Sequence, residues 1–274
     1  MKFEIILLVA LNIALGQCFL FNKANGKWND LKVTWGINPF NSKNFQSLPR
    51  TEAEAVSLGW TKEKNCSQVN GNRYIFNNDN AVLLIFDVRG IIAGIATSIP
   101  KGLPFNYPSN KIQPLFNDEG EFYTLSAYFI EPSSVCSGQV ARQLTGDRLI
   151  IKGNQKELRV PMEQQNLSGF WTQGKCFYTM GLHVWADIEG NQIDENTPEE
   201  NFSPIFLLYN SGKLNGFGFA FNADLPSKRF EHPDKNVLNM FFRRTPLFYK
   251  DANKTGKLST LHIYLDKTPR LNFC

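Results

Sequence analysis

The sequence predicts a β-rich α+β fold of two tandem similar repeats, each a short helix followed by antiparallel strands, packed into one compact body. Three observations lead to this class: a hairpin pattern that occurs twice, a tryptophan–cysteine pattern before each hairpin, and a strand followed by a cysteine at the end of each copy. We place repeat 1 at residues 49–136 and repeat 2 at residues 161–274. Repeats are sought first because a missed repeat misassigns the whole fold.

The hairpin is the clearest of the three patterns. Residues 82–95 read VLLIFDVRGIIAGI, and residues 205–217 read IFLLYNSGKLNGF. In each, an apolar run ends in an aromatic residue, a short turn with glycine follows, and the second run carries a central glycine, Gly94 or Gly216. Two β-rich runs joined by such a turn are typical of a β-hairpin.

Matching segments lie on both sides of each hairpin. Upstream, a Trp-Thr pair leads to a cysteine in residues 60–66 and again in residues 171–176. Downstream, a strand-like segment is followed by a proline and a cysteine in residues 124–136 and residues 260–274. The shared order favours a duplication over chance matches.

A short helix is expected before each tryptophan. Residues 52–57 follow Thr51, which has the spacing of a capping box with Glu54. Residues 163–168 follow Pro161, whose fixed backbone angle suits the first helical turn.

The remaining segments have separate expected roles. Residues 1–18 combine a charged start, a short apolar run and small residues at the end, the pattern of a cleaved signal peptide. Cleavage after Cys18 is favoured because it leaves an even four of the five cysteines, and cleavage after Gly16 stays open. Residues 19–48 form an N-terminal lead, and residues 137–160, with a strand-like centre, connect the repeats.

The cysteines and the signal peptide predict a secreted, extracellular protein with disulfides, because disulfides persist in oxidising compartments. The repeat makes Cys66 equivalent to Cys176 and Cys136 equivalent to Cys274. We therefore expect Cys66–Cys136 and Cys176–Cys274, each within one repeat. A pairing across the repeats stays open, since cysteine spacing alone does not fix connectivity.

Four sequons are candidate N-glycosylation sites in a secreted chain. Asparagine is common in this sequence, so some of the matches arise by chance. The acceptor residues are Asn65, Asn166, Asn201 and Asn253.

Charge and hydropathy limit the partners. The net charge is +4, and the basic residues form no run beyond the Arg243–Arg244 pair. Nucleic acid is therefore not expected as a partner. No segment after the signal peptide is long and apolar enough to span a membrane. The expected partner is an unknown extracellular protein or glycan.

Most catalytic signatures are absent from the sequence. It contains no Gly-x-Ser-x-Gly elbow, no His-Glu-x-x-His zinc motif, no phosphate-binding loop and no Cys-x-x-Cys pair. Whether the protein is an enzyme stays open at this point.

The three histidines all lie in repeat 2. If the strands that carry His183 and His262 are neighbours, their side chains face each other at about 5–7 Å. Two imidazoles and a carboxylate would then hold one transition-metal ion. The simpler interpretation is isolated, partly buried histidines and no cofactor. The third histidine is His232, and the candidate carboxylates are Asp187, Glu189 and Glu231.

An acidic segment, residues 187–200, begins like a calcium-binding loop. Gln192 takes the position that needs glycine, and Pro198 takes the position that needs glutamate. A solvated loop is therefore expected here.

Two aromatic features are candidates for the core or for ligand contact. In residues 217–221 three phenylalanines share one face of a strand, and Gly218 and Ala220 share the other. Core packing explains the phenylalanines most simply, with an apolar ligand pocket as the alternative. Trp28 and Trp35 are either core residues or a sugar-stacking platform.

These observations predict a secreted, disulfide-stabilised, N-glycosylated, non-enzymatic protein that acts as an extracellular binding or matrix component. The alternative is a metal-binding protein or metal-dependent extracellular enzyme that uses His183 and His262 of repeat 2.

Overall fold

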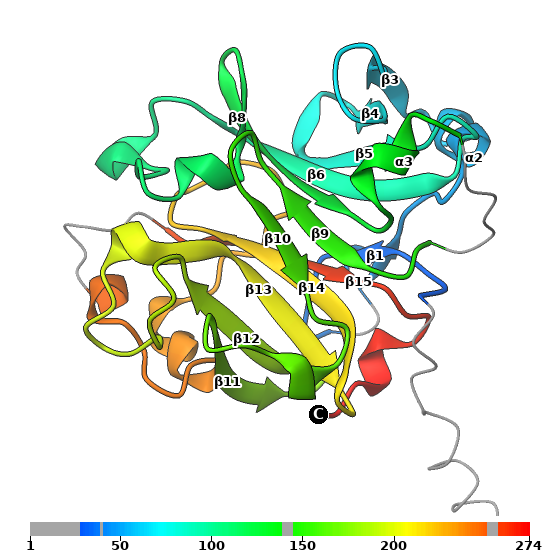
Figure 1. Ribbon diagram of the computed structural model, residues 1–274. Helices are drawn as coiled ribbons and strands as arrows, with labels where there is room; N and C mark the ends of the chain where they lie inside the picture. The colour runs from blue at the N-terminus through cyan, green and yellow to red at the C-terminus, as the bar shows by residue number, and fades with distance from the viewer. Residues whose placement is uncertain (1–27, 39–40, 139–144, 251–256) are drawn as a thin grey trace, which may run out of the picture.

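The computed structural model describes residues 28–38, 41–138, 145–250 and 257–274 (Figure 1). The chain is β-rich, with 40% strand and 15% helix, and forms two antiparallel sheets in one compact body. The expected signal peptide, Cys18 included, lies outside the described residues.

The first sheet has eight strands. Their order is β10-β9-β8-β6-β5-β4-β3, and β7 pairs with β8 beside this path. The strands are β3 (Thr61–Lys64), β4 (Asn72–Phe76), β5 (Asp79–Phe86), β6 (Ile92–Pro100), β7 (Asn117–Glu119), β8 (Phe122–Tyr128), β9 (Leu149–Lys152) and β10 (Glu157–Val160).

The second sheet has seven strands in the order β11-β12-β13-β14-β15-β1-β2. The expected hairpins are β5–β6 in the first sheet and β13–β14 in the second. The strands are β11 (Trp171–Phe177), β12 (Gly181–Asp187), β13 (Phe202–Asn210), β14 (Lys213–Phe221), β15 (Ser259–Tyr264), β1 (Lys32–Val33) and β2 (Gln46–Ser47).

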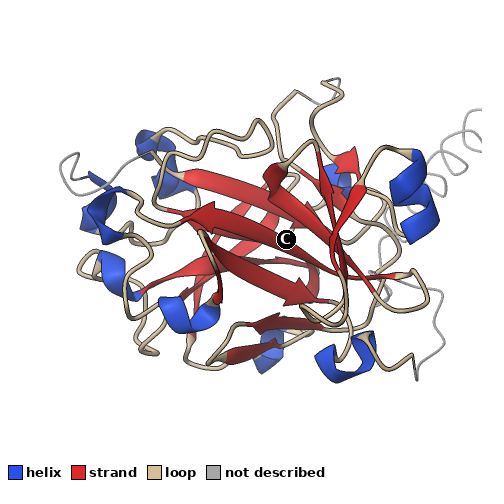
Figure 2. Cartoon of the chain, turned by 90° about the horizontal axis from the view of Figure 1, so that it is seen from above, coloured by secondary structure: helices blue, strands red, loops and turns tan. Residues whose placement is uncertain are grey.

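Short helices lie at the periphery of the stacked strands (Figure 2). In the described ranges, no helix has the length and apolar character needed to cross a membrane. The α-helices are α2 (Glu52–Ser57) and α3 (Pro132–Val135), and the 3-10 helices are η1 (Pro104–Asn106), η2 (Gln113–Leu115), η3 (Gln164–Asn166), η4 (Glu199–Asn201), η5 (Lys235–Met240), η6 (Leu247–Lys250) and η7 (Pro269–Leu271).

Only one of the two expected repeat helices forms. The Thr51 hydroxyl accepts a hydrogen bond from the Glu54 amide at 3.2 Å and caps α2, and the Glu54 carboxylate accepts from the Arg50 amide at 3.0 Å. The expected helix over residues 163–168 is wrong, because only the single turn η3 forms there. The residue before η3, Glu163, makes no cap and instead pairs with a lysine on β14.

The space between the sheets holds the main apolar core. Phe217, Phe219 and Phe221 on β14 point into it and have no exposed surface. Their rings meet rings at the ends of first-sheet strands: Phe217 lies 6.3 Å from Phe129, which follows β8, and Phe221 lies 6.5 Å from Phe116, which precedes β7. Core packing therefore explains the phenylalanine stripe.

The lead and the connector each complete a sheet that other parts of the chain begin. β1 and β2 from the lead extend the second sheet beyond β15, and β9 and β10 from the connector extend the first sheet beyond β8. The amide of Asn29 donates to the Leu265 carbonyl at 3.2 Å, and the amide of Asp147 donates to the Phe129 carbonyl at 3.1 Å. The two additions are therefore made with matching backbone hydrogen bonds.

The lead and the connector also meet each other. Trp28 forms an antiparallel bridge with Gly146, next to the two added strand pairs. The Trp28 indole is 4% exposed and donates to the Leu214 carbonyl at 3.1 Å. Trp28 is therefore a core residue and not part of an exposed sugar platform.

Two disulfides tie the ends of the strand runs. Cys66, between β3 and β4, is bonded to Cys136, which follows α3. Cys176 on β11 is bonded to Cys274. These are the within-repeat pairs that the sequence predicts.

Replacement of both Cys176 and Cys274 by serine is expected to lower the free energy of unfolding by about 2–5 kcal/mol, because the unfolded chain regains freedom. Chemical denaturation measures the change. The matched double variant at Cys66 and Cys136 should lose a similar amount, since the bridged separations are 98 and 70 residues. An unchanged unfolding free energy in either double variant contradicts the prediction.

Candidate functional site

The second sheet buries its outer face as well as its inner one. A segment that we call the cover, residues 228–250, includes η5 and η6 and packs on this face (orange in Figure 1). The ring of Phe242 stacks on Trp185 with centroids 4.3 Å apart, and Phe248 lies 5.8 Å from Phe202. The amide of Lys175 on β11 donates to the Phe241 carbonyl at 2.9 Å, which fixes the cover to the edge of the sheet.

A cavity of about 600 Å³ remains between this face, the cover and the lead. Its walls are mostly aromatic and aliphatic, and both expected histidines line it. The apolar and aromatic members of the lining are Trp35, Ile37, Phe177, Met180, Trp185, Phe206, Phe230, Pro233, Val237, Leu238, Met240, Phe241 and Leu258.

His183 and His262 come together, but not because their strands are neighbours. His183 lies on β12 and His262 on β15, with β13 and β14 between them. Their ring centroids are nevertheless 6.0 Å apart. The space over Gly216 and Gly218 on β14 is filled by the side chains of Leu208 and Phe206 from β13.

One aromatic ring occupies the space above Gly218. A Cβ atom on Gly218 would lie 2.0 Å from Cζ of Phe206. The Phe206 ring in turn lies 4.9 Å from His262 and 5.7 Å from His183. The glycine in the stripe is thus required by the packing of the cavity floor.

Glu231 in the cover is hydrogen-bonded to His262. Its carboxylate accepts from Nδ1 of His262 at 3.1 Å, from the Thr260 hydroxyl at 2.8 Å and from the Trp35 amide at 2.6 Å. With Nδ1 directed at this carboxylate, the other ring nitrogen of His262 is Nε2. That nitrogen is buried and has no hydrogen-bond partner among the described residues.

His183 is 2% exposed and lies among aromatic rings, 5.8 Å from Trp185 and 4.9 Å from Phe241. Burial, together with the nearby His262, lowers the pKa of His183 to about 3. Its imidazole is therefore neutral near pH 7. Its Nδ1 is buried, and the described part of the chain offers it no hydrogen-bond partner.

The expected third metal ligands do not join the two histidines. Asp187 accepts from the amide of Glu189, and Glu189 pairs with Lys111 at 2.7 Å in the loop after β12. Glu231 directs its oxygen to Nδ1 of His262. Across the described ranges, no group of three histidine, cysteine or carboxylate side chains is arranged to hold a metal ion.

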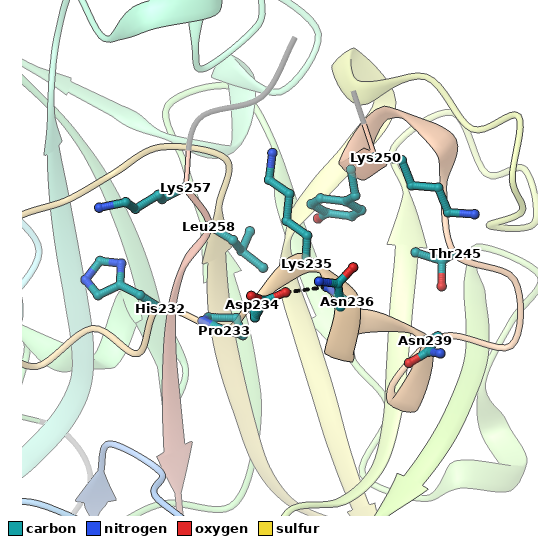
Figure 3. Close-up of a pocket in the computed structure, with 11 residues that line it drawn as sticks. His232, Pro233, Asp234, Lys235, Asn236, Asn239, Thr245, Lys250, Lys257 and Leu258 are labelled. Carbon is teal, nitrogen blue, oxygen red and sulfur yellow. Dashed lines mark hydrogen bonds between the residues drawn. The ribbon is translucent and has the colours of Figure 1, made fainter. Parts of the chain in front are cut away.

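A second, polar hollow of about 780 Å³ adjoins the cavity (Figure 3). The two share His232, Pro233 and Leu258 in their linings. Asp234 caps η5 by accepting from the amide of Asn236 at 2.8 Å. His232 lies at this boundary, 3.8 Å from a carboxylate oxygen of Asp224, and so takes no part in the histidine pair. Lysines line the hollow: Lys235, Lys250 and Lys257.

The first sheet carries an ionic cluster at the matching place on its outer face. Arg73 pairs with Ile85 across the strands, as His183 pairs with Leu208 in the second sheet. The buried Arg73 guanidinium donates to Glu119 at 2.5 Å and to Glu63 at 2.6 Å. Although burial opposes its charge, these carboxylates raise the Arg73 pKa.

Trp35 is the aromatic residue of the lead that reaches the cavity. Its indole donates to the Thr179 hydroxyl at 2.8 Å and packs edge-on against Phe177. Trp28, the other tryptophan of the lead, lies instead in the inter-sheet core. The cover was missed, although its aromatic run over residues 238–249 is the signal that could have found it.

The sequons differ in exposure. Asn65 and Asn166 are exposed, whereas Asn201 is 3% exposed and accepts from the Lys111 ammonium at 2.9 Å. Glycosylation at Asn65 and Asn166 therefore fits the folded chain better than glycosylation at Asn201. Asn253 lies outside the described residues.

Comparison with protein-family models, curated proteins and solved structures found no match for this chain. The site geometry therefore carries the functional argument.

The variant Gly218→Ala is expected to lose about 1–3 kcal/mol of stability, because an added methyl group overpacks this position. It would meet the Phe206 ring at 2.0 Å and the Leu261 carbonyl at 2.6 Å. Gly169→Ala is the control, since nothing lies within 4 Å of its added Cβ. Equal denaturation midpoints for the two variants contradict the packing argument.

The buried His183 is expected to make the fold less stable in acid. Its pKa is 6.5 when unfolded and about 3 when folded, so between these values the unfolded chain binds the extra proton. Stability contributed by neutral His183 is therefore lost as pH falls through this window, by up to about 1.4 kcal/mol per pH unit.

Urea unfolding of the wild type and of His183→Phe, repeated at several pH values, measures this effect. Phenylalanine suits the aromatic surroundings and does not titrate. The variant should show a smaller loss of stability between pH 6.5 and about pH 3. Parallel pH profiles for the two proteins refute the assignment.

Proposed function

We propose that this chain is a secreted, non-enzymatic protein that binds a small, largely apolar ligand in the cavity on the outer face of the second sheet. The cavity carries this proposal, because about 600 Å³ of space is lined mainly by aromatic and aliphatic side chains with few polar groups. Small-molecule sites are typically about 300–1,000 Å³ in volume and are lined in this way.

The rim of the cavity supports the same function. Ile37 is 84% exposed and Met240 is 47% exposed, and both belong to the lining. Exposed apolar side chains that gather at the mouth of an apolar cavity are typical of a binding site. An apolar ligand would cover them.

Secretion and glycosylation belong to the proposal. The disulfides Cys66–Cys136 and Cys176–Cys274 suit an oxidising compartment. Together with the signal-peptide pattern, they favour an extracellular protein. We propose glycans at Asn65 and Asn166, whose side chains are exposed.

We also propose that the two halves of the chain are copies of one unit. The order β3-β4-β5-β6-β8 in the first sheet matches β11-β12-β13-β14-β15 in the second. The Ile92 amide donates to the backbone carbonyl of Arg50, and in the same way the Leu214 amide donates to the backbone carbonyl of Met162. β1–β2 extend the sheet beyond β15, and β9–β10 extend the other sheet beyond β8. Each unit therefore also includes the two strands that precede its helical turn, α2 or η3.

The metal-dependent alternative has less support. A carboxylate behind a histidine, as in Glu231–His262, is typical of metal sites. The described residues supply only His183 as a second imidazole and no third ligand. We therefore prefer an apolar ligand.

The binding proposal predicts saturable binding of the apolar fluorophore N-phenylnaphthylamine to the wild type. Met240→Glu should weaken this binding at least about tenfold, because a buried methionine contact is worth roughly 1.5–3 kcal/mol. A fluorescence titration measures the affinity.

The control is Leu247→Glu, because Leu247 is 51% exposed, close to the 47% of Met240, but is not part of the lining. It should bind the fluorophore like the wild type. The absence of saturable binding, or an equal loss in both variants, overturns the proposed function.

A further inference from the structure

We propose that the ligand of this cavity is a largely apolar alcohol or phenol whose hydroxyl group binds between His262 and His183. The O–H donates to Nε2 of His262, and the oxygen accepts from a ring N–H of His183. This inference rests on the proposed function, since it names the chemical class of ligand for the same cavity.

The Glu231 carboxylate determines what His262 offers a ligand. Because Glu231 accepts from Nδ1 of His262 at 3.1 Å, the neutral ring has an acceptor at Nε2. Glu231 is held in turn by Thr260 and by the Trp35 amide, so its position is fixed by both the sheet and the lead. A lone pair fixed in this way calls for a donor from the ligand.

His183 supplies the second nitrogen. It is 2% exposed, and its Nδ1 lacks a hydrogen-bond partner within the described ranges. A buried polar atom without a partner destabilises the fold, and a ligand that pairs with it removes this penalty. A neutral imidazole carries one N–H and one lone pair, so His183 can donate to the same oxygen whose proton goes to His262.

The separation of the rings suits one shared oxygen atom. An oxygen hydrogen-bonded to one nitrogen of each ring lies about 4 Å from each ring centroid. The centroids of His183 and His262 are 6.0 Å apart, so one hydroxyl can reach both. Both nitrogens are themselves buried, so hydroxyl binding requires a rotation of the His183 ring about χ2, a torsion with a broad minimum, while Glu231 holds the His262 ring in place.

A hydroxyl fits this pair better than a carboxylate does. An ionised carboxylate would bring a second negative charge near Glu231 in an apolar cavity, where unpaired charge is costly. His183 gives no compensating charge, since burial lowers its pKa to about 3. A hydroxyl is neutral and satisfies both nitrogens.

The test compares naphthol with its methyl ether, methoxynaphthalene, by calorimetric or fluorescence titration. The two probes share an aromatic body that suits the walls, and only naphthol has the O–H donor. Wild type is expected to bind naphthol about tenfold more tightly, the worth of one good hydrogen bond. His262→Phe and His183→Phe should each bind the two probes alike.

His232→Phe is the matched control, because His232 lines the same cavity but lies outside the pair. It should keep the preference for naphthol. Near-ultraviolet circular dichroism checks that each variant is folded. If a variant fails to fold, the wild type alone still tests the inference by nuclear magnetic resonance. The ¹⁵N resonance of His262 Nε2 should shift on addition of naphthol and not on addition of methoxynaphthalene.

The outcomes separate this inference from the proposed function. If wild type binds both probes with equal affinity, the hydroxyl assignment is overturned and the apolar-ligand function stands. If it binds neither probe, both fall. Stoichiometric Zn²⁺ binding that competes with naphthol and is lost in His262→Phe and His183→Phe also overturns the inference, since the pair then holds a metal ion.

Discussion

The reciprocal completion of the two sheets is the constraint on which the rest of the structure depends. If each strand run stood alone, the part of β8 beyond its pairing with β7 would have unpaired backbone groups, and so would the edge of β15. β9–β10 cover the first edge and β1–β2 cover the second. Unpaired edges are sites of unwanted pairing. Each added strand pair comes from outside the strand run that it completes, and Trp28 bridges Gly146 next to both pairs. The two halves of the chain therefore depend on each other.

The outer faces of the two sheets stabilise buried polar groups in different ways. The first sheet satisfies Arg73 with Glu119 and Glu63, so a buried charge is matched by charges. The second sheet places the neutral His183 at the matching position and covers it with aromatic side chains of residues 228–250. A buried charge needs a partner to remain stable, whereas a neutral ring tolerates an apolar cover. This difference is consistent with an apolar cavity on the second sheet and an ionic cluster on the first.

Local sequence patterns allowed part of the fold and of the candidate site to be predicted. The hairpins follow from turn chemistry, the α2 cap follows from Thr51 and Glu54, and the disulfide pairing follows from the repeat. The convergence of His183 and His262 across two intervening strands depends on residues that no local pattern joins, such as Gly218 and Phe206. The cover and its Glu231 anchor were missed because their partners are distant in sequence.

The distribution of unsatisfied polar atoms supports our proposal of a binding site on the second sheet. Among the described residues, the buried side-chain atoms without hydrogen-bond partners all lie between His183 and Tyr264. Each costs about 1–3 kcal/mol, and buried polar groups in native proteins are rarely left unpaired. Local violations of good packing and pairing are expected where function requires them. Two such atoms are ring nitrogens of His183 and His262, which line the apolar cavity under residues 228–250. A fold under pressure for stability alone would replace them with carbon, so their presence favours a ligand that completes the site.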